Sequence, residues 1–159
     1  MNENQHLIEQ FYTAFSNQDA QKMADCYHQH AQFKDPVFGT LNRTSTVAMW
    51  KMLIERSEGN LKIEFYNLNT ADNKGTVTWV ATYNFSKTKR KVVNVIEASF
   101  EFKDGLIYRH SDVFNLWKWS RQAFGLKGFL LGWTALMQDK IKKQAKIALE
   151  KYQVEKKII

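Results

Sequence analysis

The stretch IYRHSDVFNLWKW, residues 107–119, alternates in the manner of a β-strand and carries two ionisable side chains among aromatic ones. Side chains two residues apart in a strand lie on the same face, so one face would carry Tyr108, His110, Asp112 and Phe114. An aromatic sheet face is normally packed, and a carboxylate or an imidazole there needs hydrogen-bond partners or a cavity. We therefore predict a strand in this stretch, with Asp112 facing a cavity.

The composition places this strand in a single compact domain. The chain has 159 residues with one proline and seven glycines, too few for a disordered linker. Its single cysteine, Cys26, excludes an internal disulfide and fits a reducing compartment. The polar start MNENQHLIEQ lacks the pattern of a secretory signal, and no apolar run is long enough to span a membrane. We therefore expect a soluble cytoplasmic protein without a stable membrane association.

Three amphipathic helices are predicted ahead of the strands. Apolar residues at helical spacing indicate the first helix over residues 4–17. Asp19 can cap a second helix, whose apolar stripe contains Ala20, Met23, Ala24 and Tyr27. Thr44 or Ser45 can begin a third helix that Gly59 ends, and its apolar side contains Val47, Trp50, Leu53 and Ile54.

The remaining segments predict a sheet. Ala31 and Phe33 indicate a short strand, after which Asp35-Pro36 must be extended or turned and Gly39 marks a further turn. Later in the chain the hydrophobic period changes from about 3.6 residues to about 2. Short turns then separate four strands, over residues 61–65, 77–85, 92–102 and 107–114. Short connections favour an antiparallel meander with the helices on one side, which makes an α+β domain.

An apolar connector and a basic helix follow the meander. Residues 120–132, SRQAFGLKGFLLG, lead to a last helix that Thr134 can cap, with a stripe of Met137, Ile141, Ala145, Leu149 and Tyr152. We expect this helix to dock over its own domain or a second subunit, because apolar connector residues need cover: Phe124, Phe129, Leu130, Leu131 and Trp133. A helix of this kind could also lie on a membrane surface.

The net charge of +7 comes from a basic segment at residues 87–91 and from the lysines of residues 140–157. Such charges could attract nucleic acid or an anionic surface. No nucleic-acid-binding motif accompanies them, so we interpret both groups as solvated faces and expect no nucleic-acid partner.

The order of these elements resembles the nuclear transport factor 2-like superfamily, which includes ketosteroid isomerase, SnoaL-like polyketide cyclases, scytalone dehydratase and limonene epoxide hydrolase. Three motifs carry the resemblance: FYTAFSNQDAQKMADCY (residues 11–27), FKDPVFG (residues 33–39) and IYRHSDVF (residues 107–114). The resemblance implies a cone, in which a curved antiparallel sheet packs on three N-terminal helices around a cavity. It assigns residues 1–118 to this domain, and residues 119–159 resemble the C-terminal helical extension of a bacterial SnoaL-like subgroup.

The resemblance does not imply steroid isomerase activity. Asp35 falls where ketosteroid isomerase has its general base, but the oxyanion-hole tyrosine of that enzyme falls at Phe11 and its protonated aspartate at Ala98. Two of the three parts are missing. The strand with His110 and Asp112 instead resembles SnoaL-like proteins, in which an acidic residue of the last strand faces the cavity.

We therefore single out three candidate catalytic residues. Asp35 and Asp112 could form an acid/base pair in an apolar cavity, where burial raises the pKa of a carboxyl group. His110 could orient Asp112 or carry a proton itself. The alternative is that Asp35 is only a turn acceptor and His110 only a core residue with satisfied hydrogen bonds. The ligand-contacting wall would comprise Trp79, Tyr83, Tyr108, Phe114, Trp50 and Phe11, although such aromatic residues could equally be ordinary core.

No metal or other cofactor is predicted. His28 and His30 flank a turn, and no third ligand is spaced to complete a metal site with them and Asp35. We expect both histidines to be solvent-exposed.

Two functions remain open at this point. The first is a cofactor-free isomerase, cyclase, dehydratase or hydrolase acting on a small apolar molecule. The second is a non-catalytic ligand-binding or dimeric interaction module, with the threonine-rich outer face of the sheet as a homodimer surface. An enzyme should show Asp112 and a second ionisable group in a pocket of roughly 300 Å³ or more.

Overall fold

Six strands form one curved sheet in the computed structural model, which describes residues 2–158. They are β1 (Tyr27–Asp35), β2 (Gly39–Asn42), β3 (Lys62–Ala71), β4 (Lys74–Asn84), β5 (Lys91–Lys103) and β6 (Leu106–Val113). Their order across the sheet is β2-β1-β6-β5-β4-β3, and every neighbouring pair is antiparallel except β1 with β6. The predicted antiparallel meander is thus confirmed as β3 to β6.

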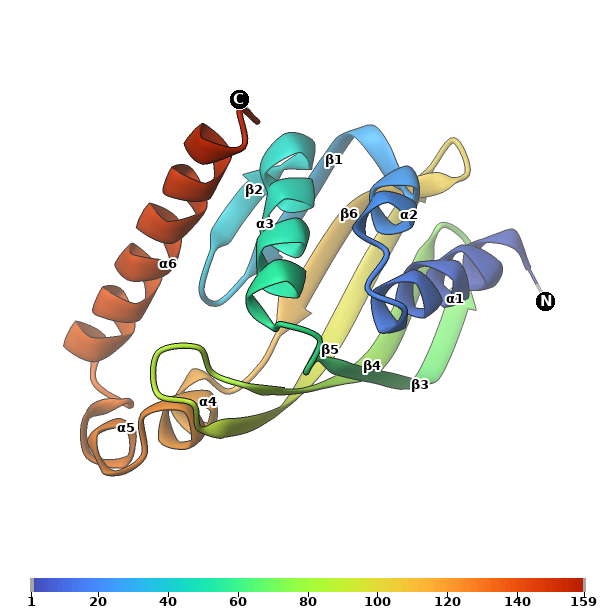
Figure 1. Ribbon diagram of the computed structural model, residues 1–159. Helices are drawn as coiled ribbons and strands as arrows, with labels where there is room; N and C mark the ends of the chain where they lie inside the picture. The colour runs from blue at the N-terminus through green and yellow to red at the C-terminus, as the bar shows by residue number, and fades with distance from the viewer. Residues whose placement is uncertain (1, 159) are drawn as a thin grey trace.

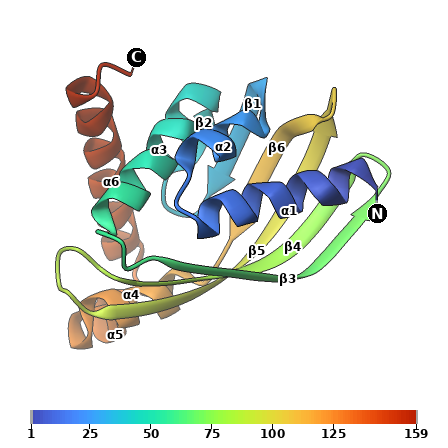
Figure 2. The same cartoon turned by 45° about the vertical axis from the view of Figure 1, so that its right-hand side comes forward.

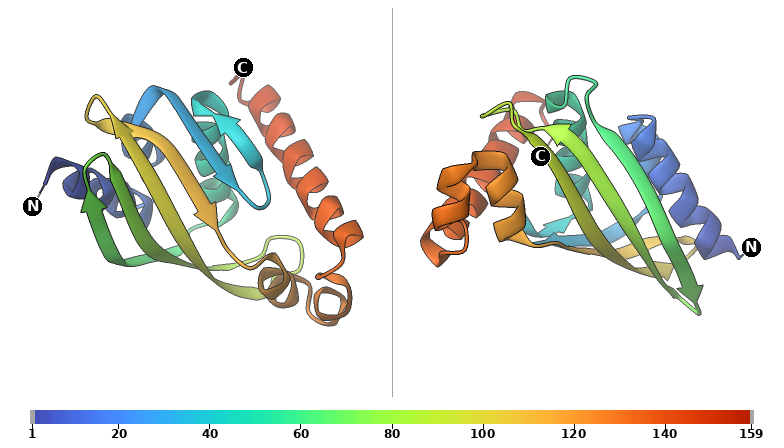
Figure 3. Two further views of the ribbon diagram at one scale, coloured as in Figure 1. Left: turned by 180° about the vertical axis from the view of Figure 1, so that it is seen from behind. Right: turned by 90° about the horizontal axis from the view of Figure 1, so that it is seen from below.

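Within residues 2–158, six helices accompany the sheet: α1 (Glu3–Ser16), α2 (Ala20–Asp25), α3 (Arg43–Arg56), α4 (Leu116–Phe124), α5 (Leu126–Leu131) and α6 (Ala135–Glu155). The first three cover one face of the sheet, and the view from behind shows the other face uncovered (Figures 1 and 3). Figure 2 shows α1 lying across the meander strands. The α+β fold class predicted from the sequence is confirmed.

The two N-terminal helices follow the predicted pattern except at the C-terminal end of α2. Asp19 caps α2 by accepting a hydrogen bond from the backbone N–H of Lys22. The assignment of Tyr27 to this helix was wrong, because α2 stops at Asp25 and Cys26 is its C-cap. Tyr27 is instead the first residue of β1, so its ring enters the core from the sheet.

Helix α3 begins earlier and buries a different side than predicted. Asn42 is its N-cap, and the Asn42 side chain accepts from the backbone N–H of Ser45. The helix ends at Arg56, before Gly59. Its buried residues are Thr46, Ala48, Met49, Trp50 and Met52, while Val47, Leu53 and Ile54 are only half-buried. The reason is that α3 packs against β1 on one side and against α6 on another, which no single stripe describes.

Strand β2 was not predicted. Gly39, expected only as a turn, has a φ of +66° and is the first residue of a short strand that pairs with β1 in antiparallel register. Four residues with little hydrophobic alternation carry too weak a pattern to be distinguished from a loop.

A β-bulge changes the alternation of β6. Arg109 pairs with Glu101 and Ile107 pairs with Phe102, so Tyr108 has no partner on β5. One extra residue in a strand shifts its later side chains to the other face relative to its earlier ones. Ile107, His110 and Asp112 are therefore buried on one side, whereas Tyr108 is not on that face.

The C-terminal helices continue the domain at one end of the sheet. Thr134 caps α6 as predicted, and the helix lies along α3 with Met137, Ile141, Leu149 and Tyr152 buried. The connector forms α4 and α5 rather than a loop (Figure 1). Within residues 2–158, no helix is both long enough and apolar enough to cross a membrane.

Candidate functional site

A cavity of about 470 Å³ lies between the sheet and the helices α3 and α6. Most of its wall is apolar, and four of the predicted aromatic residues contribute to it: Trp50, Trp79, Tyr83 and Phe114. Two carboxylates, Asp35 and Asp112, also line it. The cavity therefore combines an apolar interior with two convergent ionisable groups, the usual anatomy of a small-molecule site.

Asp112 is held by one of its two carboxylate oxygens. Oδ1 accepts from Nε2 of His110 at 2.9 Å and from the indole Nε1 of Trp79 at 3.4 Å, with Asp112 itself only 4% exposed. Oδ2 has no hydrogen-bond partner within residues 2–158. Among the side-chain nitrogen and oxygen atoms of these residues, only the Tyr12 hydroxyl is both fully buried and without a partner, so Oδ2 must be partly accessible. Because Asp112 lines the cavity, Oδ2 faces the cavity space.

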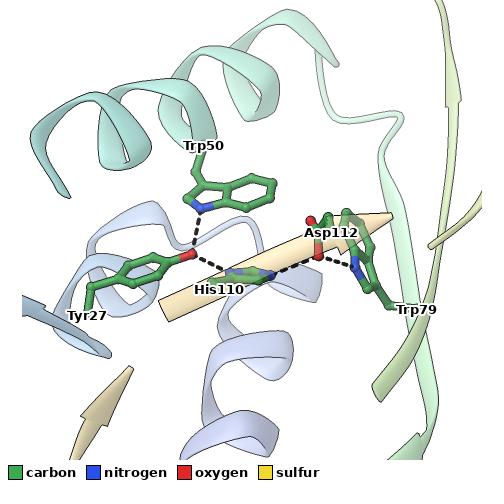
Figure 4. A network of polar contacts seen from close by, with 5 residues as sticks. All are labelled: Tyr27, Trp50, Trp79, His110 and Asp112. Carbon is green, nitrogen blue, oxygen red and sulfur yellow. Dashed lines mark hydrogen bonds and ion pairs between the residues drawn. The ribbon is translucent and has the colours of Figure 1, made fainter. Parts of the chain in front are cut away.

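His110 is the centre of a chain of hydrogen bonds that runs from α3 to Asp112 (Figure 4). The indole N–H of Trp50 donates to the Tyr27 hydroxyl at 3.0 Å, and that hydroxyl lies 2.8 Å from Nδ1 of His110. An indole can only donate, so the Tyr27 oxygen accepts from Trp50 and its own proton is free for Nδ1. Nε2 of His110 then carries a proton and donates it to Asp112. Every donor in the chain thus points toward the Asp112 carboxylate.

Aromatic rings enclose this chain and exclude water from it. The His110 ring lies 4.4 Å from Phe100, 5.0 Å from Phe33 and 5.6 Å from Phe11, measured between ring centroids. Burial raises the pKa of the Tyr27 hydroxyl. That tyrosine is consequently a neutral hydrogen-bond donor, and the surrounding rings hold the imidazole in one orientation.

Asp35 is a turn acceptor that also lines the cavity. Its Oδ1 accepts from the backbone N–H of Val37 at 2.9 Å and of Phe38 at 2.5 Å, so it is a turn acceptor. Burial, and to a smaller degree the charge of Asp112, raises the pKa of Asp35 to about 6, although the two backbone donors lower it. A carboxyl group that changes its protonation near neutral pH therefore faces the same cavity as Asp112.

Two predicted ligand-contacting residues do not reach the cavity. Phe11 is fully buried and lies behind His110, packed edge-to-face against its ring. Tyr108 is moved off this face by the β-bulge and packs against His28 and the Lys103 ammonium instead. Both placements depend on neighbours far apart in the sequence, so the spacing of β6 alone could not reveal them.

Two residues of the site escaped the sequence analysis. Tyr27 was placed on a helix, and little in the sequence argued against it, because the regular alternation of β1 begins only at Ala31. Asn94 of β5 could have faced either way, and the structure places it in the cavity wall.

The histidines near β1 form no metal site with the surrounding residues. The expectation that His28 is solvent-exposed was wrong, because it is 6% exposed and lies 3.2 Å from the Asp104 carboxylate. His30 is exposed, as predicted. Across residues 2–158, no group of three histidine, cysteine or acidic residues is arranged to hold a metal ion.

Comparison with known families agrees with this architecture. The family described as SnoaL-like domain matches residues 8–110, which is most of the chain. The protein belongs to the SnoaL-like family. The match stops two residues before Asp112, so membership alone assigns no role to that carboxylate. No functionally curated protein matches the sequence.

Solved structures share the SnoaL-like, nuclear transport factor 2-like fold at low sequence identity. Bal32a, from a soil-derived mobile gene cassette, has 17% identity and a TM-score of 0.68 over 76% of this chain and 96% of its own. A candidate polyketide cyclase of Xanthomonas campestris has 17% identity and a TM-score of 0.62, with the same coverage. An LEH-like epoxide hydrolase of M. tuberculosis has 19% identity and a TM-score of 0.57 over 85% of this chain and 95% of its own. At such identities the likeness establishes the fold alone.

Proposed function

We propose that this SnoaL-like protein binds a small apolar molecule in its cavity and transfers protons on it with its own side chains, Asp112 being the acting carboxylate. The observation that carries the proposal is the asymmetry of Asp112, whose Oδ1 is anchored by two ring N–H groups while Oδ2 faces the cavity. A proton-transferring group needs a fixed position and one free atom within reach of the substrate.

The remaining residues fit defined roles in such a reaction. Asp112 removes a proton from a carbon, hydroxyl or water held in the cavity, and the hydrogen bond from His110 keeps its oxygen oriented. Asp35, with a pKa of about 6, can deliver a proton to a second atom of the same molecule. Isomerisation, cyclisation, dehydration and hydrolysis all need this pair of steps. Structural neighbours named as a candidate polyketide cyclase and an epoxide hydrolase support this range.

The experiment measures proton abstraction directly, without knowledge of the natural substrate. The protein is incubated in D2O with 2-tetralone, an apolar ketone with acidic C–H groups, and their exchange is followed by NMR. We expect exchange catalysed by the wild-type protein and a loss of about a hundredfold or more in Asp112→Asn, which keeps the shape of the side chain. Far-UV circular dichroism should show an unchanged fold.

Asp72→Asn is the matched control, because Asp72 is exposed in the turn between β3 and β4. Its exchange rate should equal that of the wild type. Undiminished exchange in Asp112→Asn would refute the catalytic role of this residue.

The second candidate function is non-catalytic ligand binding. It is favoured by the observation that both ring nitrogens of His110 have partners and that Asp35 already accepts two backbone hydrogen bonds. In that case the wild-type protein would bind 2-tetralone without exchanging its protons. Ala81→Phe, which places a ring in the cavity wall, should abolish binding under either function.

We also infer that the protein forms a homodimer through the outer face of its sheet, and that it works in the cytoplasm. Exposed apolar residues on the outward side of the meander support the dimer: Tyr66, Val93, Val95 and Val113. The buried free thiol of Cys26 is consistent with a reducing compartment.

A further inference from the structure

The end of the molecule formed by α5 carries an exposed apolar surface that the rest of the described chain does not cover. Its members are Leu126, Phe129, Leu130, Leu131, Trp133 and Leu136, with exposed fractions between 47% and 85%. We call this set the tip patch. The sequence predicted that the last helix docks over its own domain or a second subunit; α6 packs on α3 and lines the cavity, and it leaves these connector residues in solvent. Exposed clusters of this size on a folded domain usually mark a binding surface.

The positive charge of the protein is concentrated in the same segment. Residues 114–159 contain ten Lys and Arg against three Asp and Glu, a net charge of +7. Residues 1–113 contain thirteen of each and are therefore neutral. The whole net charge of the chain thus belongs to the part that carries the tip patch.

Two of these cations adjoin the tip patch directly. Lys127 lies on α5 between Leu126 and Phe129 and is exposed. Lys140 follows Leu136 by one helical turn of α6, so the two side chains lie on the same side of the helix. The apolar surface therefore has lysines at its margin.

We propose that the tip patch docks on the surface of an anionic lipid bilayer. Apolar and aromatic side chains at the centre enter the interfacial region, and the surrounding lysines bind anionic headgroups. The Trp133 indole N–H already donates to the carbonyl of Leu130 at 3.0 Å, so its ring can leave water without losing a hydrogen bond. Figure 3 shows α4 and α5 projecting beyond the sheet, so the tip patch lies at an end of the molecule.

The cavity wall adjoins this surface. Phe124, Lys127 and Lys140 belong both to the cavity wall and to the segments that form the tip. Docking would thus bring the cavity opening close to the bilayer, and an apolar molecule could pass between the two with little exposure to water. That passage rests on the proposed function, whereas docking does not.

The test is sedimentation of the full-length protein with vesicles, in the absence of any cavity ligand, so a failure of the proposed enzymatic function cannot affect it. Vesicles of phosphatidylcholine with about one quarter phosphatidylglycerol are compared with vesicles of phosphatidylcholine alone. We expect binding to the mixed vesicles to be about tenfold tighter or more, and to weaken as the salt concentration rises from about 0.1 M to about 0.5 M.

Two variants separate the apolar from the cationic contribution. Phe129→Ser/Leu130→Ser and Lys127→Glu/Lys140→Glu should each weaken binding by about tenfold or more. Ile147→Ser/Val154→Ser is the matched control, since it removes exposed apolar residues from α6 outside the tip patch, and it should bind like the wild type. The circular dichroism of each variant should match that of the wild type.

Two results would overturn the proposal. The first is an absence of binding to the anionic vesicles, and the second is equal binding by the wild type and the Phe129→Ser/Leu130→Ser variant. A further measurement then tests a second copy of the chain as the occupant. If the wild type does not bind vesicles, and the Phe129→Ser/Leu130→Ser variant has a lower mass than the wild type in analytical ultracentrifugation, the tip patch is an interface between subunits.

Discussion

At the scale of single residues, burial decides what each ionisable group can do. Asp112 and His110 are almost fully enclosed, and the hydrogen bond between them joins a donor to an acceptor, which offsets part of the cost of burying them. Asp35 differs, because its carboxyl group is buried beside another acid and its pKa is raised to about 6. The folded protein consequently holds the Asp35 proton more tightly than the unfolded chain does.

This difference predicts a pH dependence of stability. The favourable contribution of protonated Asp35 is complete below the ordinary pKa of 3.8 and is lost as the pH rises to the folded value of about 6. Asp35→Asn does not titrate and can still accept from Val37 and Phe38 through its Oδ1. We therefore expect the free energy of unfolding of the variant, relative to the wild type, to rise by about 2 to 3 kcal/mol between pH 4 and pH 7.

Urea denaturation at several pH values measures this change. Asp139→Asn, at an exposed position of α6, should follow the wild-type pH profile throughout. Parallel profiles for Asp35→Asn and the wild type would show that the carboxyl group is not buried as the structure has it.

At the scale of elements, a β-bulge positions the site, and a close contact between two helices positions the tip patch. The bulge at Tyr108 turns His110 and Asp112 inward after Ile107, so a single unpaired residue decides which side chains reach the cavity. The crossing of α4 and α5 depends on Gly128, where an added Cβ would lie 1.9 Å from the carbonyl oxygen of Ser120. Only glycine lets the two backbones approach this closely.

Gly128→Ala should therefore displace α5 from α4. The clash is with backbone rather than with a flexible side chain, so we expect a loss of about 2 kcal/mol or more in the local stability of α5. Hydrogen exchange measures it, with faster exchange in α5 and unchanged protection in β5 as the internal control. Wild-type exchange rates throughout α5 would contradict the packing of this helix pair.

At the scale of the whole molecule, the two faces of the sheet have different surroundings. The inner face meets the helices and the cavity, whereas the outer face exposes Val93 at 38% and Val95 at 43% to solvent. Their burial against a second copy would remove apolar surface from water, the principal driving force of association.

Sedimentation at micromolar concentration should therefore give the mass of a dimer. Val95→Lys would place a charge in the interface, and we expect it to shift the protein to the monomer mass without changing its circular dichroism. Thr40→Lys, on the exposed edge strand β2, is the corresponding control. A monomer mass for the wild type would contradict the inferred dimer.

Local pattern in the sequence was sufficient for most of the elements. The stripes of the first and last helices, the cap at Asp19, the period-2 strands and the placement of His110 with Asp112 on one face depend on neighbours within a few residues, where periodicity and capping chemistry operate. The resemblance to the nuclear transport factor 2-like superfamily added their arrangement around a cavity, because the order of elements is itself a property of the sequence.

Tertiary structure alone decided which of these residues share a site. Tyr27 joins His110 across 83 positions of the chain, and Trp79 reaches Asp112 across 33. The bulge that keeps Tyr108 out of the cavity arises from the pairing of β6 with β5. The exposure of the tip patch results from the path of α6. Interactions between distant segments depend on how the chain is folded in space. Periodicity along the chain contains no information about which distant segments come together.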